Sequence, residues 1–273
     1  MNPQADRFPS VTVCASRDEL GRNAADQAAK PLRSALELRG RARLMLAAAE
    51  SQRATLAALS ADPSVDWSRV ECFHMDEYIG LPQHAPQRFS NWLQVNFFSK
   101  LPVPPIFHRL MPTGSGSAEA LRYEAVMGTA PFDAVLLGLG VNAHLAFNDP
   151  PADLSDARAA RVVSLDAVSR QQQVDEGYFS SLHDVPRVAV TVTIPRLLNS
   201  ISVIASVPGK EKRRAVTKAL TMPISGLCPG TALRTHPQVN LYLDPESAPE
   251  GFSDTWAEQE PERAQDRDEA SAK

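Results

Sequence analysis

Acid and base side chains follow two apolar segments of this chain, 70–75 (VECFHM) and 132–139 (FDAVLLGL). The residues able to move or orient protons are Asp76 and Glu77 after the first segment, and Asn142, His144 and Asp149 after the second. A buried parallel strand that ends in polar residues is the usual layout of a ligand site in an open α/β sheet. The two segments therefore predict an enzyme that transfers protons with a carboxylate and an imidazole.

The imidazole candidate is His144. A lone histidine is usually structural, but Asn142 and Asp149 stand close enough in the sequence to orient its ring and to stabilise its charged form. A zinc site would need further His or Cys ligands at short spacing, and the sequence around His144 has none. The expected role of His144 is therefore general acid–base catalysis without a metal.

The carboxylate candidates are Asp76 and Glu77. Successive residues at a strand end point to opposite sides, so only one of them can face a given site. A carboxylate partly desolvated between Met75 and Tyr78 would have a raised pKa and could move protons. The alternative is a solvated loop or a helix cap. His74 is expected to pack or to support the site.

The glycine turn at 138–143, GLGVNA, formally matches the dinucleotide-binding pattern G-x-G-x-x-A after a strand. That pattern also requires a helix of several turns at this point, and Pro150 and Pro151 arrive too soon for one. The glycines are instead expected to let the backbone pass close to a small ligand, and no organic cofactor is expected.

Composition narrows the classes of partner. The 273 residues carry a net charge of -4 and a pI near 5.9, which argues against nucleic acid or an anionic membrane as the main partner. No apolar run approaches the roughly 18 residues that span a bilayer, and the segment MNPQADRFPS has neither the basic nor the apolar region of a secretory signal. The widely spaced Cys14, Cys72 and Cys228 fit buried, reduced thiols in a cytoplasmic protein.

Apolar strand patterns alternate with helical patterns along most of the chain. Strands are expected at 11–15, 42–48, 70–75, 132–139, 162–165, 188–194, 203–207 and 239–243, and helices at 18–38, 53–59, 88–100, 118–127, 167–179 and 210–219. Pro31 should start a new helix or kink the first one. The alternation predicts a three-layer, Rossmann-like α/β fold with a mostly parallel sheet and helices on both faces.

The chain shows no internal repeat and no linker-like break, so residues 1–245 are expected to form a single α/β domain. Residues 246–273 are acidic and rich in Ala and Pro. Such a tail buries too little apolar area to offset its ordering entropy and is expected to be disordered.

Two spaced motifs carry a family resemblance: FHMDEYIGLP at 73–82, and the stretch from Gly138 that ends in HLAFNDP at 144–150. In this order they resemble the glucosamine-6-phosphate deaminase/isomerase family, which shares its fold with the 6-phosphogluconolactonases. The similarity covers about residues 40 to 245. The wording MDEY-x-GLP favours the deaminase over the lactonase, whose strand usually ends in a D-E-R pattern.

The resemblance implies a mechanism. Asp76 would shuttle a proton between C2 and C1 of an open-chain amino-sugar phosphate, and His144, held by Asp149, would assist opening of the pyranose ring. The products would be fructose 6-phosphate and ammonia, formed without metal or organic cofactor. The partner is then a small sugar phosphate, and the sequence leaves the oligomeric state open, a homo-oligomer included.

Four residues depart from the family's pattern. Val141 stands where the family has an Asn, Asn142 where it has an Asp, Ala143 where it has a Gly, and Asp149 where it has a Glu. An amide can orient His144 but cannot carry a negative charge. Asn142→Asp is therefore expected to raise turnover if the missing carboxylate limits ring opening.

The phosphate site is expected where the segment 47–55 leads into a helix, because free N–H groups and the helix dipole attract anions there. Glu50 would repel a phosphate if it faced inward. By resemblance Lys212 matches the family's phosphate lysine. The substrate-binding set is completed by Ser51, Gln52, Glu77, Arg161 and Arg170.

Two alternatives to a deaminase remain from the sequence. One is a related activity on another sugar phosphate, either aldose–ketose isomerisation or lactone hydrolysis. The other is a non-catalytic sugar-phosphate-binding protein, which the departures at Asn142 and in the phosphate loop would allow.

Overall fold

The computed structural model describes residues 9–252. The strands are β1 (Ser10–Val13), β2 (Ala42–Leu46), β3 (Val70–His74), β4 (Asp76–Tyr78), β5 (Ile106–His108), β6 (Phe132–Leu137), β7 (Ala160–Ser164), β8 (Val188–Val192), β9 (Ser200–Val207) and β10 (Val239–Leu243). The α-helices are α1 (Arg17–Arg39), α2 (Arg53–Ser60), α3 (Phe89–Asn96), α4 (Ser117–Met127), α5 (Ala167–Asp175), α6 (Ile194–Leu198) and α7 (Arg213–Thr221). Short 3-10 helices are η1 (Glu50–Gln52), η2 (Trp67–Arg69), η3 (Phe98–Lys100), η4 (Lys210–Lys212) and η5 (Pro229–Thr235).

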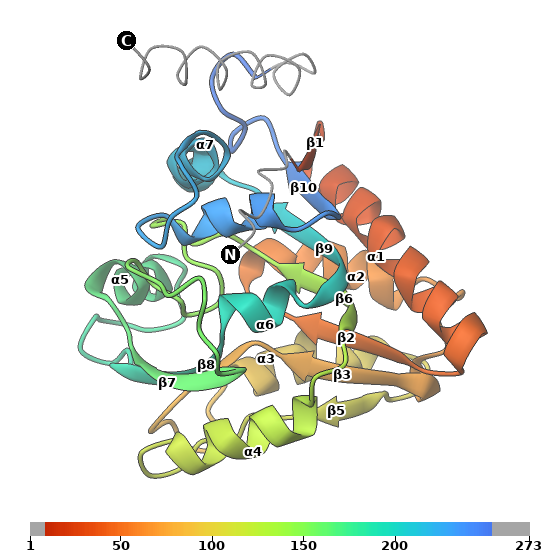
Figure 1. The fold of residues 1–273 in the computed structure, drawn as a ribbon, viewed down its shortest axis with the longest axis horizontal. Coiled ribbons are helices and arrows are strands. Elements are labelled where there is room, and N and C mark those ends of the chain that lie inside the picture. Colours follow the sequence, from red (N-terminus) through yellow and green to blue (C-terminus); the bar gives the residue numbers. More distant parts are fainter. Residues whose placement is uncertain (1–8, 253–273) are drawn as a thin grey trace.

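A seven-stranded sheet in the order β1-β10-β9-β6-β2-β3-β5 forms the centre, and every neighbouring pair in it is parallel. The central strand β6 is buried along its whole length because helices cover both faces. Ala134 and Leu136 join the core under α1, α2 and α3, whereas Val135 and Leu137 join the core under α4, α6 and α7 (Figure 1). The predicted three-layer fold is thus confirmed.

The strand order reverses between β2 and β6. From β2 the chain adds β3 and β5 on one side, and it then returns to build β6, β9 and β10 on the other side of β2. At such a switch point the loops that leave the two neighbouring strands part in opposite directions and leave a crevice at the carboxyl ends. The loops after β2 and β6 therefore form the natural walls of a ligand site.

A second, three-stranded antiparallel sheet in the order β4-β8-β7 lies beside these loops. The strands predicted at 162–165 and 188–194 belong to it, so placing them with the parallel crossovers was wrong. Apolar strand patterns do not record the direction of pairing, and here β8 pairs with β4, which the sequence pattern missed. The pairing of Asp76 with Thr191 fixes the start of β4 at the edge of the crevice.

Other differences from the sequence prediction are local. No new helix starts at Pro31, which lies within the continuous helix α1. The proline costs the helix one backbone hydrogen bond. The burial of Ala28, Leu32 and Ala35 from the same helix in the core outweighs that cost. The short elements β5 and α6 were not predicted, and α5 ends at Asp175 rather than at 179.

Residues 246–252 belong to the segment that was expected to be disordered, yet they are placed in the structure. Ser247 is fully buried, and its N–H donates to the carboxylate of Asp244 at 2.8 Å, so this part packs against the end of β10. The rest of the expected tail, 253–273, lies outside the described residues. The cysteines Cys14, Cys72 and Cys228 are buried and unpaired. Within residues 9–252 no helix is long and apolar enough to cross a membrane.

Candidate active site

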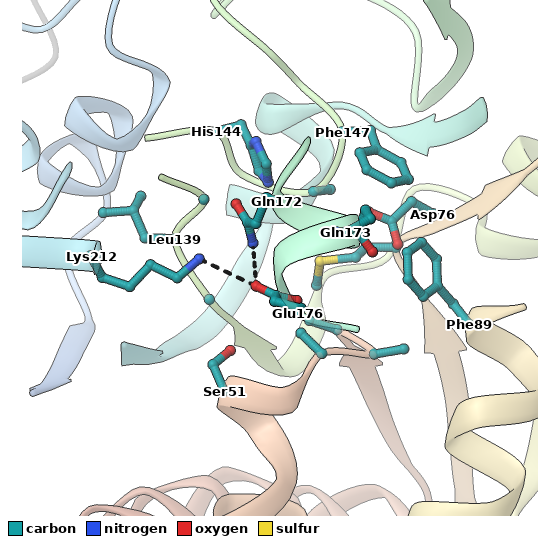
Figure 2. Close-up of a pocket in the computed structure, with 17 residues that line it drawn as sticks. Ser51, Asp76, Phe89, Leu139, His144, Phe147, Gln172, Gln173, Glu176 and Lys212 are labelled. Carbon is teal, nitrogen blue, oxygen red and sulfur yellow. Dashed lines mark hydrogen bonds and ion pairs between the residues drawn. The ribbon is translucent and has the colours of Figure 1, made fainter. Parts of the chain in front are cut away.

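A pocket opens at the switch point of the sheet (Figure 2). Its walls come from the loops after β2, β3, β6 and β9, and from one face of α5. The lining residues that bear functional groups are Ser51, Asp76, His144, Gln172, Gln173, Glu176 and Lys212, and Phe89 and Phe147 add aromatic surface. Asp76 and His144, the two residues predicted to move protons, thus face one cavity.

Asp76 begins β4, and its side chain lines the pocket. The residue is 8% exposed, and within residues 9–252 nothing donates a hydrogen bond or forms an ion pair with its carboxylate. Burial, reinforced by the nearby charge of Glu77, raises the pKa of Asp76 well above its usual range. A buried carboxyl group without partners is costly for folding, which is typical of a group kept for its reactivity.

Glu77 does not line the pocket, so the structure does not place it with the residues predicted to bind the substrate. Its carboxylate accepts hydrogen bonds from the hydroxyl of Ser90 at 2.9 Å and from the N–H groups of Ser90 and Phe89 at 3.1 and 3.2 Å. Arg88 Nε lies 3.8 Å away. Glu77 therefore caps the amino end of α3, and only Asp76 of the adjacent pair is available for chemistry.

His144 is held by the turn after β6. The N–H of Gly140 donates to the carbonyl of His144 at 3.1 Å, and a Cβ at Gly140 would lie within 2.4 Å of the imidazole atoms. Gly140 thus makes room for the ring, which refines the expectation that the glycines allow close approach to a ligand. Ala143 takes a φ of 67°, a left-handed conformation that costs an alanine energy and that glycine adopts freely.

Two side chains that do not line the pocket contact the imidazole of His144, and a third supports them. His144 Nδ1 lies 3.1 Å from the carboxylate of Asp149 and 2.8 Å from the hydroxyl of Ser169, and that hydroxyl donates to Asp149. Because both neighbours then present acceptors, Nδ1 carries a hydrogen and Nε2 keeps its lone pair. Asn142 completes the group by donating to Asp149 at 3.1 Å and accepting from the N–H of His144 at 3.2 Å.

The same contacts keep Asp149 ionised. Burial opposes ionisation, but the hydrogen bond and charge of His144, with hydrogen bonds from Ser169 and from the N–H of Asp166, outweigh it and lower the pKa of Asp149 to about 2. A fixed negative charge behind an imidazole stabilises its protonated form as it accepts a proton. Asp149 can therefore support His144 as sequence analysis predicted.

Four site residues that sequence analysis missed lie on α5 and at its carboxyl end. Ser169, Gln172, Gln173 and Glu176 are spaced i, i+3, i+4 and i+7, which places them on one side of the helix. Gln172, Gln173 and Glu176 line the pocket (Figure 2), and Ser169 contacts His144. Ser169 is fully buried and Gln173 is 7% exposed. A polar stripe at the spacing usual for an apolar core face was the signal that could have identified them.

Of the predicted phosphate ligands, Ser51 and Lys212 line the pocket. Gln52 does not, because its amide nitrogen donates at 3.1 Å to the carbonyls of Leu137 and Ser206 and so ties the carboxyl ends of β6 and β9 together. Glu50 pairs with Arg53 and is also absent from the lining. The site thus keeps a hydroxyl and an ammonium for an anion.

The two arginines predicted as phosphate ligands lie elsewhere. Arg161 is on β7 in the antiparallel sheet and pairs with Asp156 at 2.7 Å. Arg170 donates to the carbonyls of Leu182 and Val185 and so braces the loop after α5. Their positions on strand β7 and helix α5 direct both guanidinium groups away from the cavity. The sequence alone could not show this, because it does not specify which face of each element turns toward the cavity. Within residues 9–252 no cluster of three metal-ligating side chains is found.

The sequence pattern of one protein family, described as glucosamine-6-phosphate isomerases/6-phosphogluconolactonase, matches residues 15–240. The chain belongs to the glucosamine-6-phosphate isomerase/6-phosphogluconolactonase family. This places the protein among enzymes that act on sugar phosphates, and the pocket at the switch point is where members of an α/β family bind such ligands.

Two relatives are named glucosamine-6-phosphate deaminase. The one from Halothermothrix orenii is 31% identical over an alignment that covers 71% of this chain and 80% of the relative. The one from Staphylococcus epidermidis is 33% identical over 68% of this chain and 76% of the relative. A solved structure of a monomeric glucosamine-6-phosphate deaminase matches with a TM-score of 0.77 at 28% identity, over 87% of this chain and 98% of the other. A 6-phosphogluconolactonase from Shewanella baltica shares the fold, with a TM-score of 0.71 at 17% identity over 88% and 98%.

The contacts of Asn142 reverse the expectation for Asn142→Asp. Its amide N–H donates to Asp149, so a carboxylate at 142 would face a second carboxylate at about the same separation and repel it. We expect Asn142→Asp to lower turnover of the sugar-phosphate substrate about tenfold, the effect of losing one charge-assisted hydrogen bond. Steady-state kinetics at pH 7.5 checks this, and a rate above that of the wild type would show that the amide limits the reaction.

Ser169→Ala is expected to lower kcat about tenfold and to leave KM unchanged, because the hydroxyl positions His144 and Asp149 without lining the pocket. Ser202→Ala is a matched control, since Ser202 is a buried serine of β9 whose hydroxyl has no hydrogen-bond partner in the described part of the chain. Equal kcat values for the two variants would contradict a positioning role for Ser169.

Proposed function

We propose that this protein is a glucosamine-6-phosphate deaminase/isomerase that converts an amino-sugar phosphate and water to a ketose phosphate and ammonia. The observation that carries the proposal is one pocket lined by both Asp76, a carboxyl group without a hydrogen-bond or ion-pair partner in residues 9–252, and His144, an imidazole backed by a carboxylate. The names of the relatives at about 30% identity support the same activity.

The first step assigned to the site is ring opening. His144 lines the pocket, and its Nε2 is the ring nitrogen that does not contact Asp149 or Ser169. Nε2 therefore accepts the proton of the O1 hydroxyl and returns a proton to the ring oxygen O5 as the bond from C1 to O5 breaks. Asp149 holds the opposite nitrogen and stabilises the imidazolium formed between the two transfers.

The second step is isomerisation. The carboxylate of Asp76 removes the proton from C2 of the open aldehyde, and O1 takes up a proton that the ammonium group on C2 gives up. Asp76 then delivers its proton to C1, which leaves a hydroxyl at C1 and a protonated C=N bond at C2. Water adds to C2, ammonia leaves, and the carbonyl of fructose 6-phosphate forms. A raised pKa makes the carboxylate a stronger base than an exposed one, and desolvation removes water that would compete for its lone pairs.

The pocket also suits the two ends of such a ligand. Phe89 and Phe147 offer apolar surface beside Asp76, and Lys212 with Ser51 offers an ammonium and a hydroxyl for an anionic group. The reaction proposed requires no metal and no organic cofactor, because each step is a proton transfer or the addition and loss of a small neutral molecule.

The test is to incubate the wild-type protein with glucosamine 6-phosphate and to quantify ammonia and fructose 6-phosphate. The proposal predicts equal amounts of both products. Hydrolysis of 6-phosphogluconolactone without ammonia release would instead identify a lactonase. Tight binding of the sugar phosphate, measured by calorimetry, with no turnover would identify a binding protein and end the proposal.

A further inference from the structure

The cation of the pocket already has a partner. Lys212 is the one Lys or Arg among the described residues that line the cavity, and it is 5% exposed. Its ammonium lies 3.7 Å from the carboxylate of Glu176, as the dashed line in Figure 2 shows. An anionic group that enters the pocket therefore meets an ion pair rather than a free ammonium.

The position of Glu176 is fixed by further contacts. The amide nitrogen of Gln172 donates to the Glu176 carboxylate at 2.6 Å, and the amide oxygen of Gln172 accepts the N–H of Val141 at 3.0 Å. This chain of hydrogen bonds links the carboxylate to the loop after β6. Glu176 is thus built into the wall of the pocket beside Lys212.

The Glu176 carboxylate can still move away from Lys212. Glu176 stands one residue beyond the last residue of α5, and its side chain is 23% exposed. Gly177 follows with a φ of 80° and starts the loop after the helix. Rotation of the Glu176 side chain toward solvent would free Lys212 without opening the core.

We propose that Glu176 determines the specificity of this pocket by competing with the phosphate group of a ligand for Lys212. The inference rests on the proposed function only in placing the phosphate end of the sugar at Lys212. A phosphate dianion would have to displace the Glu176 carboxylate, because the two anions repel each other at one ammonium. Ligands without a phosphate would leave the ion pair intact, so Glu176 weakens binding of phosphorylated sugars selectively.

The test compares affinities of the intact wild-type protein and its Glu176→Gln variant, which keeps the size and the hydrogen bond to Gln172. Calorimetry with inorganic phosphate and with glucose 6-phosphate, which has no amine to release, should show binding about tenfold tighter for the variant. Unphosphorylated glucosamine should bind both proteins equally. Glu211→Gln is the matched control, because Glu211 is an exposed carboxylate next to Lys212 in sequence that does not line the pocket.

A double-mutant cycle separates this effect from a change of fold. In a Lys212→Met background, Glu176→Gln should tighten binding of glucose 6-phosphate less than it does in the wild type, because the ion pair that the phosphate must break is gone and only the repulsion between the two anions remains. Unchanged or weaker phosphate binding by Glu176→Gln alone would overturn the inference. Ammonia release plays no part in these measurements, so absence of deaminase activity would end the proposed function and leave this result standing.

Discussion

Asp76→Asn is expected to lower ammonia release from glucosamine 6-phosphate by about 10²–10⁴-fold, the range supplied by a positioned general base. The same variant should melt at a higher temperature than the wild type. Its amide is uncharged, so it avoids the cost of ionising a carboxyl group that is 8% exposed and has no hydrogen-bond partner among the described residues. A rise of about 2–4 °C corresponds to ~1 kcal/mol in a domain of this size.

The pH dependence of this stabilisation has a definite sign. The folded-state pKa of Asp76 is raised above its unfolded value, so the folded protein binds more protons between the two values and loses stability as pH rises through them. The gain in melting temperature from Asp76→Asn over the wild type should therefore be small at pH 4 and larger at pH 8. For the wild type, kcat/KM should rise with pH above the usual carboxyl range, because the base must be ionised to act.

Glu77→Gln is the matched control for Asp76→Asn, since it neutralises the adjacent carboxylate. Glu77 accepts three hydrogen bonds at the amino end of α3, so its neutralisation should lower the melting temperature by several degrees. The folded variant should keep most of its kcat, because Glu77 does not line the pocket. If Glu77→Gln lost turnover as completely as Asp76→Asn, the assignment of the base to Asp76 alone would be wrong.

Asp149→Asn is expected to lower kcat by about 10²–10⁴-fold, because the imidazole of His144 then loses the charge that stabilises its protonated form. Asp153→Asn is the control: Asp153 is an exposed carboxylate beyond the same loop, and its neutralisation should leave kcat unchanged. Steady-state kinetics on both variants provides the measurement. If Asp149→Asn turned over substrate as fast as the wild type, the assignment of ring opening to a His144 imidazole supported by Asp149 would be wrong.

Stability gives an independent check on Asp149. Its folded-state pKa of about 2 lies below the unfolded value, so its contribution to the free energy of unfolding is present above about pH 4 and is lost as pH falls toward 2. The difference between the wild type and Asp149→Asn, about 2 kcal/mol at pH 7, should shrink across this window. Denaturant unfolding at pH 7 and at pH 3 measures both values.

The sequence was sufficient to predict the strands that deliver the chemistry. Continuous apolar runs at 70–75 and 132–139 mark buried parallel strands, and a parallel sheet brings their carboxyl ends to one edge. The apolar pattern alone therefore predicts that Asp76 and His144 lie near each other. It could not choose between Asp76 and Glu77, because the choice depends on β4 pairing with β8, residues more than 100 positions away.

The residues that sequence reasoning misplaced share a physical cause. Gln52, Arg161 and Arg170 all have the donors a phosphate needs, but their hydrogen bonds go to backbone carbonyls or to Asp156. These acceptors lie far away in the sequence, or are brought into place by the conformation of a loop, so the sequence does not show that they occupy the donors. Conversely, Ser169 and Glu176 enter the site because tertiary packing turns one face of α5 toward His144 and Lys212, and no local pattern specifies that partner.

The central claim is that Asp76 and His144 act on one sugar phosphate, and a crystal structure of Asp76→Asn with glucosamine 6-phosphate tests it most directly, since this variant should bind the substrate without consuming it. The account predicts the side chain at position 76 about 3–3.5 Å from C2 and C1, His144 Nε2 at hydrogen-bond distance from the ring oxygen or O1, and the phosphate at Lys212 with Glu176 displaced. A sugar bound with C2 remote from position 76, or a ligand seated away from His144, would contradict it.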